Sequence, residues 1–289
     1  MGKERTWEKK GSKDIKVTGM EDKRQVTCCV SSSSDGTLLP MQIIFTSKTK
    51  RSSPKTDVAK ICLADGFHLT MSLNHWSNLE TCQQFVHRIL VPYFERIMKE
   101  LQLPPNQKMV WLLDCWSVHK SQAFLTWMKR EHPHICVLFV PANCTSKLQP
   151  ADVILQRPLK CAFSRSFKQW SAACIQKQLE DDVSIVQLDL SIKTLREELC
   201  TWLLQAWKEV GSRKQMIVKG WGKCGLLRVF DRAFQAEAME SHSHTSLFSD
   251  TNTNDEHEEF SDDIDEWEEL FEDEDIMGLM ARCVVNNEV

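Results

Sequence analysis

Two short apolar runs in the middle of the chain form its most informative pattern. Met109–Leu113 ends abruptly on Asp114, and Ile135–Val140 is followed by a polar loop. Each run is too short for a helix and is rich in β-branched and aromatic residues, so both predict buried neighbouring strands of an α/β sheet. Because ligands of such sheets bind beyond the carboxyl ends of the strands, we expect a functional site at the residues that follow.

The pattern before these runs predicts more of the sheet. Residues 25–31 and 38–46 alternate or run apolar on either side of Ser32–Gly36, where an Asp-Gly pair is typical of a hairpin turn. This predicts an antiparallel pair of strands. Residues 48–60 predict a loop, and residues 67–71 predict one further strand.

Helical spacing accounts for most of the remaining chain. Ser77–Glu80 matches a capping box and opens an amphipathic helix that continues to Leu101, with a kink expected at Pro92. A shorter helix is predicted over residues 122–130. Residues 154–210 carry two long helical patterns that we expect to cover the sheet as a helical extension.

Charge divides the chain into a basic body and an acidic tail. Residues 1–239 hold 35 Lys and Arg against 23 Asp and Glu, a net charge of +12, whereas residues 240–289 hold 1 against 17, a net charge of −16. A basic body suits DNA, because Lys and Arg that neutralise phosphates release counterions. A lysine-rich surface without a nucleic-acid partner is the alternative.

The tail, residues 241–289, is acidic enough for us to expect it to be largely disordered. Four apolar residues among its acids form a pattern typical of segments that fold as a short helix on a protein partner. They are Ile264, Trp267, Leu270 and Phe271. A tail that only improves solubility is the alternative.

Cysteine usage and hydropathy exclude several other classes. None of the 12 cysteines forms a C-x-x-C pair, and many lie in apolar runs, which favours reduced core cysteines over a disulfide scaffold or a zinc module. No stretch reaches the ~18 consecutive apolar residues of a membrane span, so we expect no membrane partner.

Two motifs in the body resemble a known family. Residues 112–120 read LLDCWSVHK, and residues 140–152 read VPANCTSKLQPAD, followed by RPLK at 157–160. Together they closely resemble the DDE superfamily endonuclease domain of pogo/Tigger/Jerky-type transposases. Upstream words at 11–13, 21–27 and 39–45 are also similar to that family, so the resemblance covers roughly residues 5 to 230.

The resemblance implies an α/β fold with a ribonuclease-H-like mixed sheet and flanking helices. Residues 25–230 would form this domain after a basic lead-in, residues 1–24. We expect the domain to lack its first strand, which lies in the middle of the sheet in the family. We also expect the N-terminal helix-turn-helix region of such transposases to be missing.

The chemistry that the resemblance implies is phosphoryl transfer on two divalent ions, Mg²⁺ or Mn²⁺. Asp114 would be the second acid of the catalytic set and Asp152 the third, with His119 and Lys120 flanking the site. Both aspartates are therefore predicted metal ligands. The alternatives are an N-cap role for Asp152 ahead of the following helix and a turn role for Asp114.

The first acid has no counterpart in this sequence. Glu4, Glu8 and Asp14 do not follow an apolar run, so none replaces it. We therefore expect a nuclear, DNA-binding, transposase-derived protein with impaired catalysis. Transposases act as multimers, so the resemblance is compatible with a homo-oligomer, and the sequence leaves the oligomeric state open. The alternative is a protein-interaction or transcription-regulatory module that acts through the acidic tail.

Overall fold

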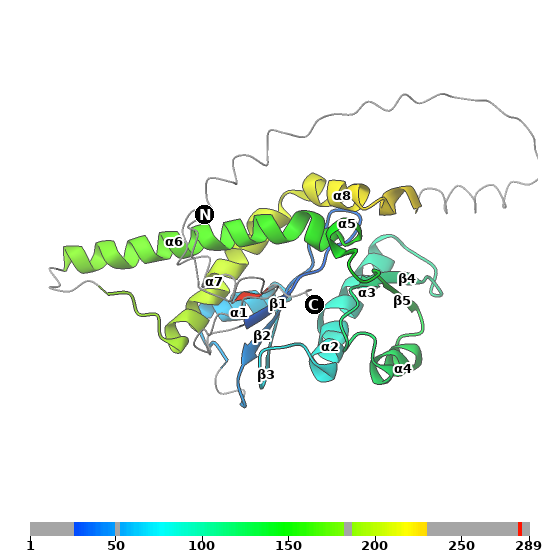
Figure 1. Ribbon diagram of the computed structural model, residues 1–289, viewed down its shortest axis with the longest axis horizontal. Helices are drawn as coiled ribbons and strands as arrows, with labels where there is room; N and C mark the ends of the chain where they lie inside the picture. Colours follow the sequence, from blue (N-terminus) through cyan, green and yellow to red (C-terminus); the bar gives the residue numbers. More distant parts are fainter. Residues whose placement is uncertain (1–25, 50–52, 182–186, 230–282, 285–289) are drawn as a thin grey trace, which may run out of the picture.

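The computed structural model describes residues 26–49, 53–181, 187–229 and 283–284, with helices and strands in mixed order (Figure 1). The strands are β1 (Val26–Cys29), β2 (Gln42–Thr46), β3 (His68–Ser72), β4 (Met109–Leu113), β5 (Ile135–Phe139) and β6 (Cys283–Val284). The α-helices are α1 (Asp57–Ala64), α2 (Leu79–Phe85), α3 (Val91–Glu100), α4 (Gln122–Glu131), α5 (Thr145–Leu148), α6 (Gln156–Glu180), α7 (Ile192–Gly211) and α8 (Lys214–Lys223). Two π-helical turns are η2 (Val86–Leu90) and η3 (Ala151–Leu155).

The predicted hairpin is confirmed. β1 pairs antiparallel with β2, and Val26 lies opposite Phe45. Gly36 turns the chain with φ of +88°, and a Cβ atom there would lie 2.6 Å from the carbonyl oxygen of Lys214. Both observations explain glycine at this position, since the conformation favours it and a side chain would collide with α8.

The loop predicted over residues 48–60 is wrong from Asp57 onward, where α1 begins. The Thr56 side chain accepts a hydrogen bond from the backbone N–H of Ala59 and so caps the helix. Ala59 and Cys62 are the buried residues of α1, too few for a strong apolar pattern. The predicted strand over 67–71 is confirmed as β3, which pairs in parallel with β2.

The two apolar runs are confirmed as neighbouring strands. β4 and β5 pair in parallel, with Met109 level with Ile135. Their predicted burial is only partly right, because Val110 and Leu138 are each 51% exposed. Both of these side chains border a cleft, which leaves one side of this short sheet accessible.

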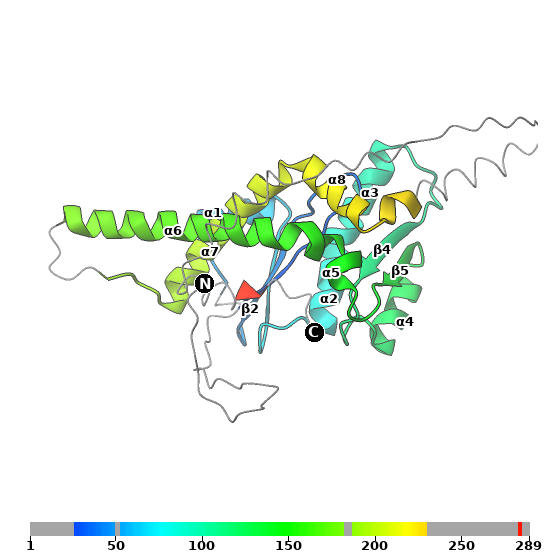
Figure 2. The same ribbon diagram turned by 45° about the horizontal axis from the view of Figure 1, so that its top comes forward.

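The described strands form two separate sheets rather than one. The first has the order β3-β2-β1-β6, and the second consists of β4 and β5. Both views of the ribbon place the second sheet beside helices α2 to α4, away from β2 and β3 (Figures 1 and 2).

The helix predicted from Ser77 to Leu101 exists as α2, η2 and α3 in succession. Its N-cap is Asn78 rather than Ser77, because Asn78 Oδ1 accepts a 3.0 Å hydrogen bond from Thr81 N–H while Thr81 Oγ1 accepts one from Asn78 N–H. The π-helical turn η2 ends directly before Val91 and Pro92, at the irregularity expected from the proline.

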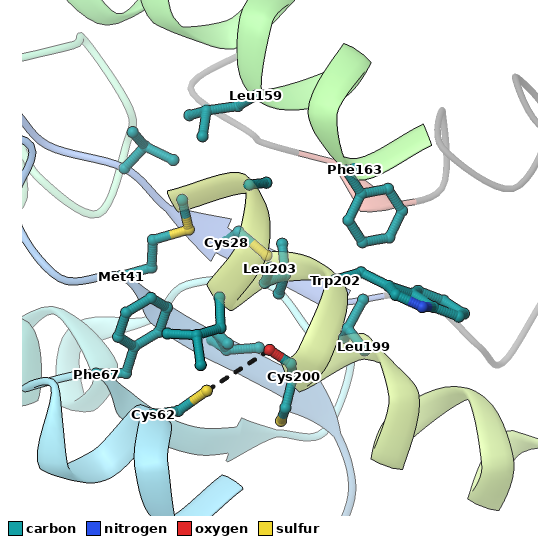
Figure 3. Packing of buried hydrophobic residues seen from close by; sticks show 14 of the residues in the cluster. Cys28, Met41, Cys62, Phe67, Leu159, Phe163, Leu199, Cys200, Trp202 and Leu203 are labelled. Carbon is teal, nitrogen blue, oxygen red and sulfur yellow. Dashed lines mark hydrogen bonds between the residues drawn. The ribbon is translucent and has the colours of Figure 1, made fainter. Parts of the chain in front are cut away.

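Helices α6 and α7 cover the first sheet, as the two long helical patterns predicted (Figure 3). Trp202 of α7 lies edge-on to Phe163 and Phe167 of α6, with ring centroids 5.6 and 5.2 Å apart. From the other side Cys62 of α1 donates a hydrogen bond to the carbonyl oxygen of Cys200. This cluster of buried side chains joins the first and last thirds of the body.

A second buried cluster lies between the α2–α3 helix, α4 and β4. Phe124, fully buried, is at its centre and contacts Trp111 of β4 and Trp127 of its own helix. The helix predicted over 122–130 is thereby confirmed as α4, capped by Ser121.

In the described part of the chain no helix is long and apolar enough to cross a membrane. The predicted lead-in over residues 1–24 lies outside the described residues. The same holds for the predicted tail over residues 241–289, of which only Cys283 and Val284 are described.

Candidate metal-dependent nuclease site

Asp114 follows the last residue of β4, as the strand pattern predicts, and is only 6% exposed. The backbone of Leu113 still bonds to Val140 N–H, so the carboxylate projects from a strand end that is fixed by pairing. Asp114 Oδ1 lies 2.7 Å from His119 Nδ1 and 3.3 Å from Trp116 N, and it accepts a hydrogen bond from each. The bond from Trp116 is the turn role considered as an alternative, and Asp114 also lies in the wall of a cleft.

His119 is held as a cation beside Asp114. Burial alone would lower the pKa of this imidazole, but the hydrogen bonds with Asp114 and Cys82 and the nearby charges raise it to about 9. The ion pair is largely shielded from water, with side chains 16% and 6% exposed. His119 therefore compensates the buried carboxylate at neutral pH.

Two cysteines extend this polar group. Cys82, placed on the apolar face of its helix by its spacing, is indeed in the second buried cluster, but its sulfur also lies 3.2 Å from Ser77 Oγ. Burial, then the charges of Cys82 and Asp114, raise the pKa of the Cys29 thiol to about 12. The thiols of Cys29 and Cys82 therefore lie next to the site. The apolar patterns in which these cysteines occur predicted only that they would be buried.

Asp152 lies in η3, and its side chain is half-buried. Its Oδ1 accepts a hydrogen bond from the side-chain amide of Gln156. The N-cap of η3 is Pro150, so the structure does not give Asp152 the capping role considered as an alternative.

A cleft of about 530 Å³ opens in front of these residues. Asp114 and His119 lie in its wall, together with Gln149, Pro150 and Ala151, the segment just before Asp152. The structure thus brings His119 to Asp114 and brings the second motif to the same cleft. Asp152 itself is not among the residues that line it.

The acids among the described residues do not form a complete two-ion site. Within the described ranges no three His, Cys, Asp or Glu side chains are arranged to hold a metal ion together. One oxygen of Asp114 is already engaged by His119. Since Mg²⁺ can bind through one or two carboxylates and several waters, the arrangement fits at most a single hydrated ion on Asp114 or Asp152.

An aromatic pair at the cleft was not foreseen from the sequence. Trp76 and Trp116 stack with ring centroids 5.7 Å apart and an interplanar angle of 14°, and both line the cleft. Trp116 lies inside the first motif, two residues after Asp114, and this position could have indicated that its ring lies at the site. Trp76 follows the turn after β3, and nothing in the sequence indicated that it would reach the cleft.

Comparison with known families agrees with this geometry. The family model described as DDE superfamily endonuclease matches residues 22–221, more than half of the chain. The chain therefore belongs to the DDE superfamily endonuclease family, whose members normally use divalent metal ions. Neither the curated proteins nor the solved structures that were compared with it gave a match.

Proposed function

We propose that this chain is a transposase-derived DNA-binding protein of the pogo/Tigger/Jerky type whose endonuclease-like site is catalytically impaired. The observation that carries the proposal is the buried Asp114, which the end of β4 directs into a cleft beside His119. The second motif meets the same cleft through Gln149–Ala151. A ribonuclease-H-like sheet would need a further strand between β1 and β4, which fits the two separate sheets.

Impaired catalysis follows from the ligands at hand. In-line phosphoryl transfer on two ions needs carboxylates that bridge and fix both of them. Among the described residues Asp114 and Asp152 are not joined by a third ligand, and His119 forms an ion pair with Asp114. One weakly held ion could bind. A single ion would not stabilise both the attacking oxygen and the leaving oxygen of the phosphoryl transfer.

DNA binding is supported by the charge of the body and by two lysines next to the motifs. Lys120 follows His119, and Lys147 lies in α5 before Asp152; both are exposed. At these positions they can reach the phosphates of a strand that enters the cleft. The acidic tail would compete for the same lysines and lower the affinity.

The test is binding to a labelled DNA duplex at several salt concentrations. We expect affinity to fall steeply with salt, and the double variant Lys120→Ala/Lys147→Ala to bind less tightly with a slope smaller by about 2, since each phosphate contact contributes roughly 0.9. Lys99→Ala/Lys129→Ala removes two exposed lysines from α3 and α4 and is the matched control. Equal losses in both variants would show that the DNA does not follow this cleft.

Metal binding is tested by calorimetry with Mn²⁺. We expect weak binding that vanishes in Asp114→Ala/Asp152→Ala, and no Mn²⁺-dependent nicking of plasmid DNA above the level of Asp114→Ala. Binding that is equal in the parent chain and the double variant would remove the two aspartates as ligands. Robust nicking that depends on Asp114 would overturn the impaired-catalysis proposal.

The alternative function is a regulatory or protein-interaction module in which the tail contacts a partner. The contrast between a body of net charge +12 and a tail of net charge −16 supports it. A partner that is lost with Trp267→Ala while DNA binding persists would favour this function. A nuclear location and a homo-oligomer are part of the main proposal of a transposase-derived DNA-binding protein. Microscopy tests the location, and light scattering tests the oligomeric state.

A further inference from the structure

The cleft runs along the edge of one strand, β4, and over one face of β1. Side chains alternate between the two faces of a strand, so a cavity on one face touches every second residue. All five residues of β4 line this cleft, and so do Thr27 and Cys29 of β1. The cleft therefore also reaches the edge of β4, where backbone N–H and C=O groups face it.

The walls of the cleft suit an extended peptide segment. Leu39, Phe85 and Leu113 make part of the wall apolar, and their side chains are buried. Four buried polar atoms of residues in the wall have no hydrogen-bond partner among the described residues: Thr27 Oγ1, Gln42 Oε1, Trp116 Nε1 and Gln149 Oε1. Buried polar groups in proteins are normally paired, which indicates that something else completes this cleft.

The edge of β1 that faces away from β2 already carries part of a strand. β6 pairs with it in parallel, with Cys283 level with Val26 and Val284 level with Thr27 (Figure 1, red). This covers only the first two residues of β1. The chain continues beyond Val284 as VNNEV, and in the same register Val285 would come level with Cys28.

We propose that the C-terminal segment, residues 283–289, docks into the cleft between β1 and β4 as an added strand. Adding a strand to an exposed edge supplies backbone hydrogen bonds for affinity and uses alternate side chains for specificity. Continued in the register of β6, the segment would bring Val285 level with Cys28 and Asn286 level with Cys29. The segment joins the two sheets and covers the wall of the cleft beside Asp114.

The length of chain before the segment permits this docking. Residues 230–282 separate the described end of the body from β6, and an extended chain spans about 3.3 Å per residue. The inference does not depend on DNA or metal binding, since it rests on strand edges and apolar walls alone.

The first experiment compares hydrogen exchange of the full chain with that of a chain truncated after Ala281. We expect the β1 amides that point away from β2 to exchange at least tenfold faster after truncation, while the β1 amides bonded to β2 and the amides of β2 and β3 keep their protection. A peptide of residues 282–289 added in trans should restore protection of β1. Unchanged exchange in β1 would overturn the proposal.

A second experiment tests the register and the source of the strand. Paired strands lie about 4.8 Å apart, within reach of a disulfide, so Val26→Cys should crosslink to the native Cys283 under mild oxidation. Peptide mapping locates the bond, and Val26→Cys/Cys283→Ser is the matched control. A crosslink within one chain supports the proposal, whereas a crosslink only between two chains would assign the segment to a second copy and overturn it.

Discussion

His119 Nδ1 donates a hydrogen bond to Asp114 Oδ1 over 2.7 Å, in a site where both side chains are largely buried. Burial lowers the pKa of the imidazole, but the hydrogen bond and the charge of the Asp114 carboxylate help to raise it, and the imidazolium lies against the carboxylate as its ion-pair partner.

Asp114→Asn should therefore lower the pKa of His119 from about 9, because burial lowers this pKa and the hydrogen bond and charge of the Asp114 carboxylate, which raise it, are lost. The loss of a hydrogen bond between charged groups should also reduce the free energy of unfolding by roughly 2 kcal/mol. NMR titration of the imidazole checks the first expectation, and urea denaturation the second. Asp152→Asn is the control, and a His119 that still titrates near 9 in Asp114→Asn would contradict the pairing.

The contact of α8 with η3 makes a second prediction. A Cβ atom at Gly220 would lie 2.2 Å from Cγ2 of Ile154, two residues from Asp152, so Gly220→Ala should destabilise the fold by roughly 1–3 kcal/mol. At Gly222 the nearest atom to a Cβ is 3.6 Å away, so Gly222→Ala should be neutral or stabilise by up to about 1 kcal/mol. Thermal denaturation compares the two. Ile154→Ala removes Cγ2, so the double variant Gly220→Ala/Ile154→Ala should lose less stability than the sum of the two single variants.

The N-terminal cap of α2 provides a third prediction. Asn78→Ala removes the acceptor for Thr81 N–H and should cost about 1 kcal/mol of the free energy of unfolding. Glu80→Gln alters an exposed residue of the first turn that is not part of the capping box, and should change stability by less than about 0.5 kcal/mol. If the two substitutions cost the same in urea denaturation, the cap is not the one that the structure shows.

His132 should make the fold sensitive to mild acid. Burial, then the charges of His87 and His134, lower the pKa of this imidazole, and its Nε2 has no partner within the described residues. The unfolded chain then binds the proton more tightly, so stability should fall as pH drops from about 6.5 toward the lower folded value. Urea denaturation between pH 5 and 8 should show a weaker pH dependence in His132→Gln. Parallel curves for the two proteins would contradict this.

Strand pairing and the position of Asp114 could be predicted because they depend on local pattern. The run Met109–Leu113 followed by an acid predicts a strand end whatever surrounds it, and the structure confirms the strand. α1 could not be predicted in this way, since its burial rests on two small side chains, Ala59 and Cys62. Its stability comes from contacts with α7, more than a hundred residues away in the chain.

The environment of Asp114 was out of reach for a similar reason. Lys120 and His119 were expected near it from the motif, but Cys82 and Trp76 reach the cleft from other elements. No spacing in the sequence relates these residues to β4, so only the packed structure brings them together. The division of the strands into two sheets also depends on this packing.

The two buried clusters differ in how the chain builds them. The cluster around Phe124 draws almost entirely on residues 82–139, so it can assemble from one continuous stretch. The cluster under α6 and α7 joins Cys62 to Cys200, which are 138 positions apart. At synthesis rates of about 5–20 residues per second, strands β1 to β3 are made roughly ten seconds before α7, the helix that covers them. During that interval the apolar face of these strands is accessible to chaperones and to aggregation. All residues of the cluster around Phe124 have by then been synthesised.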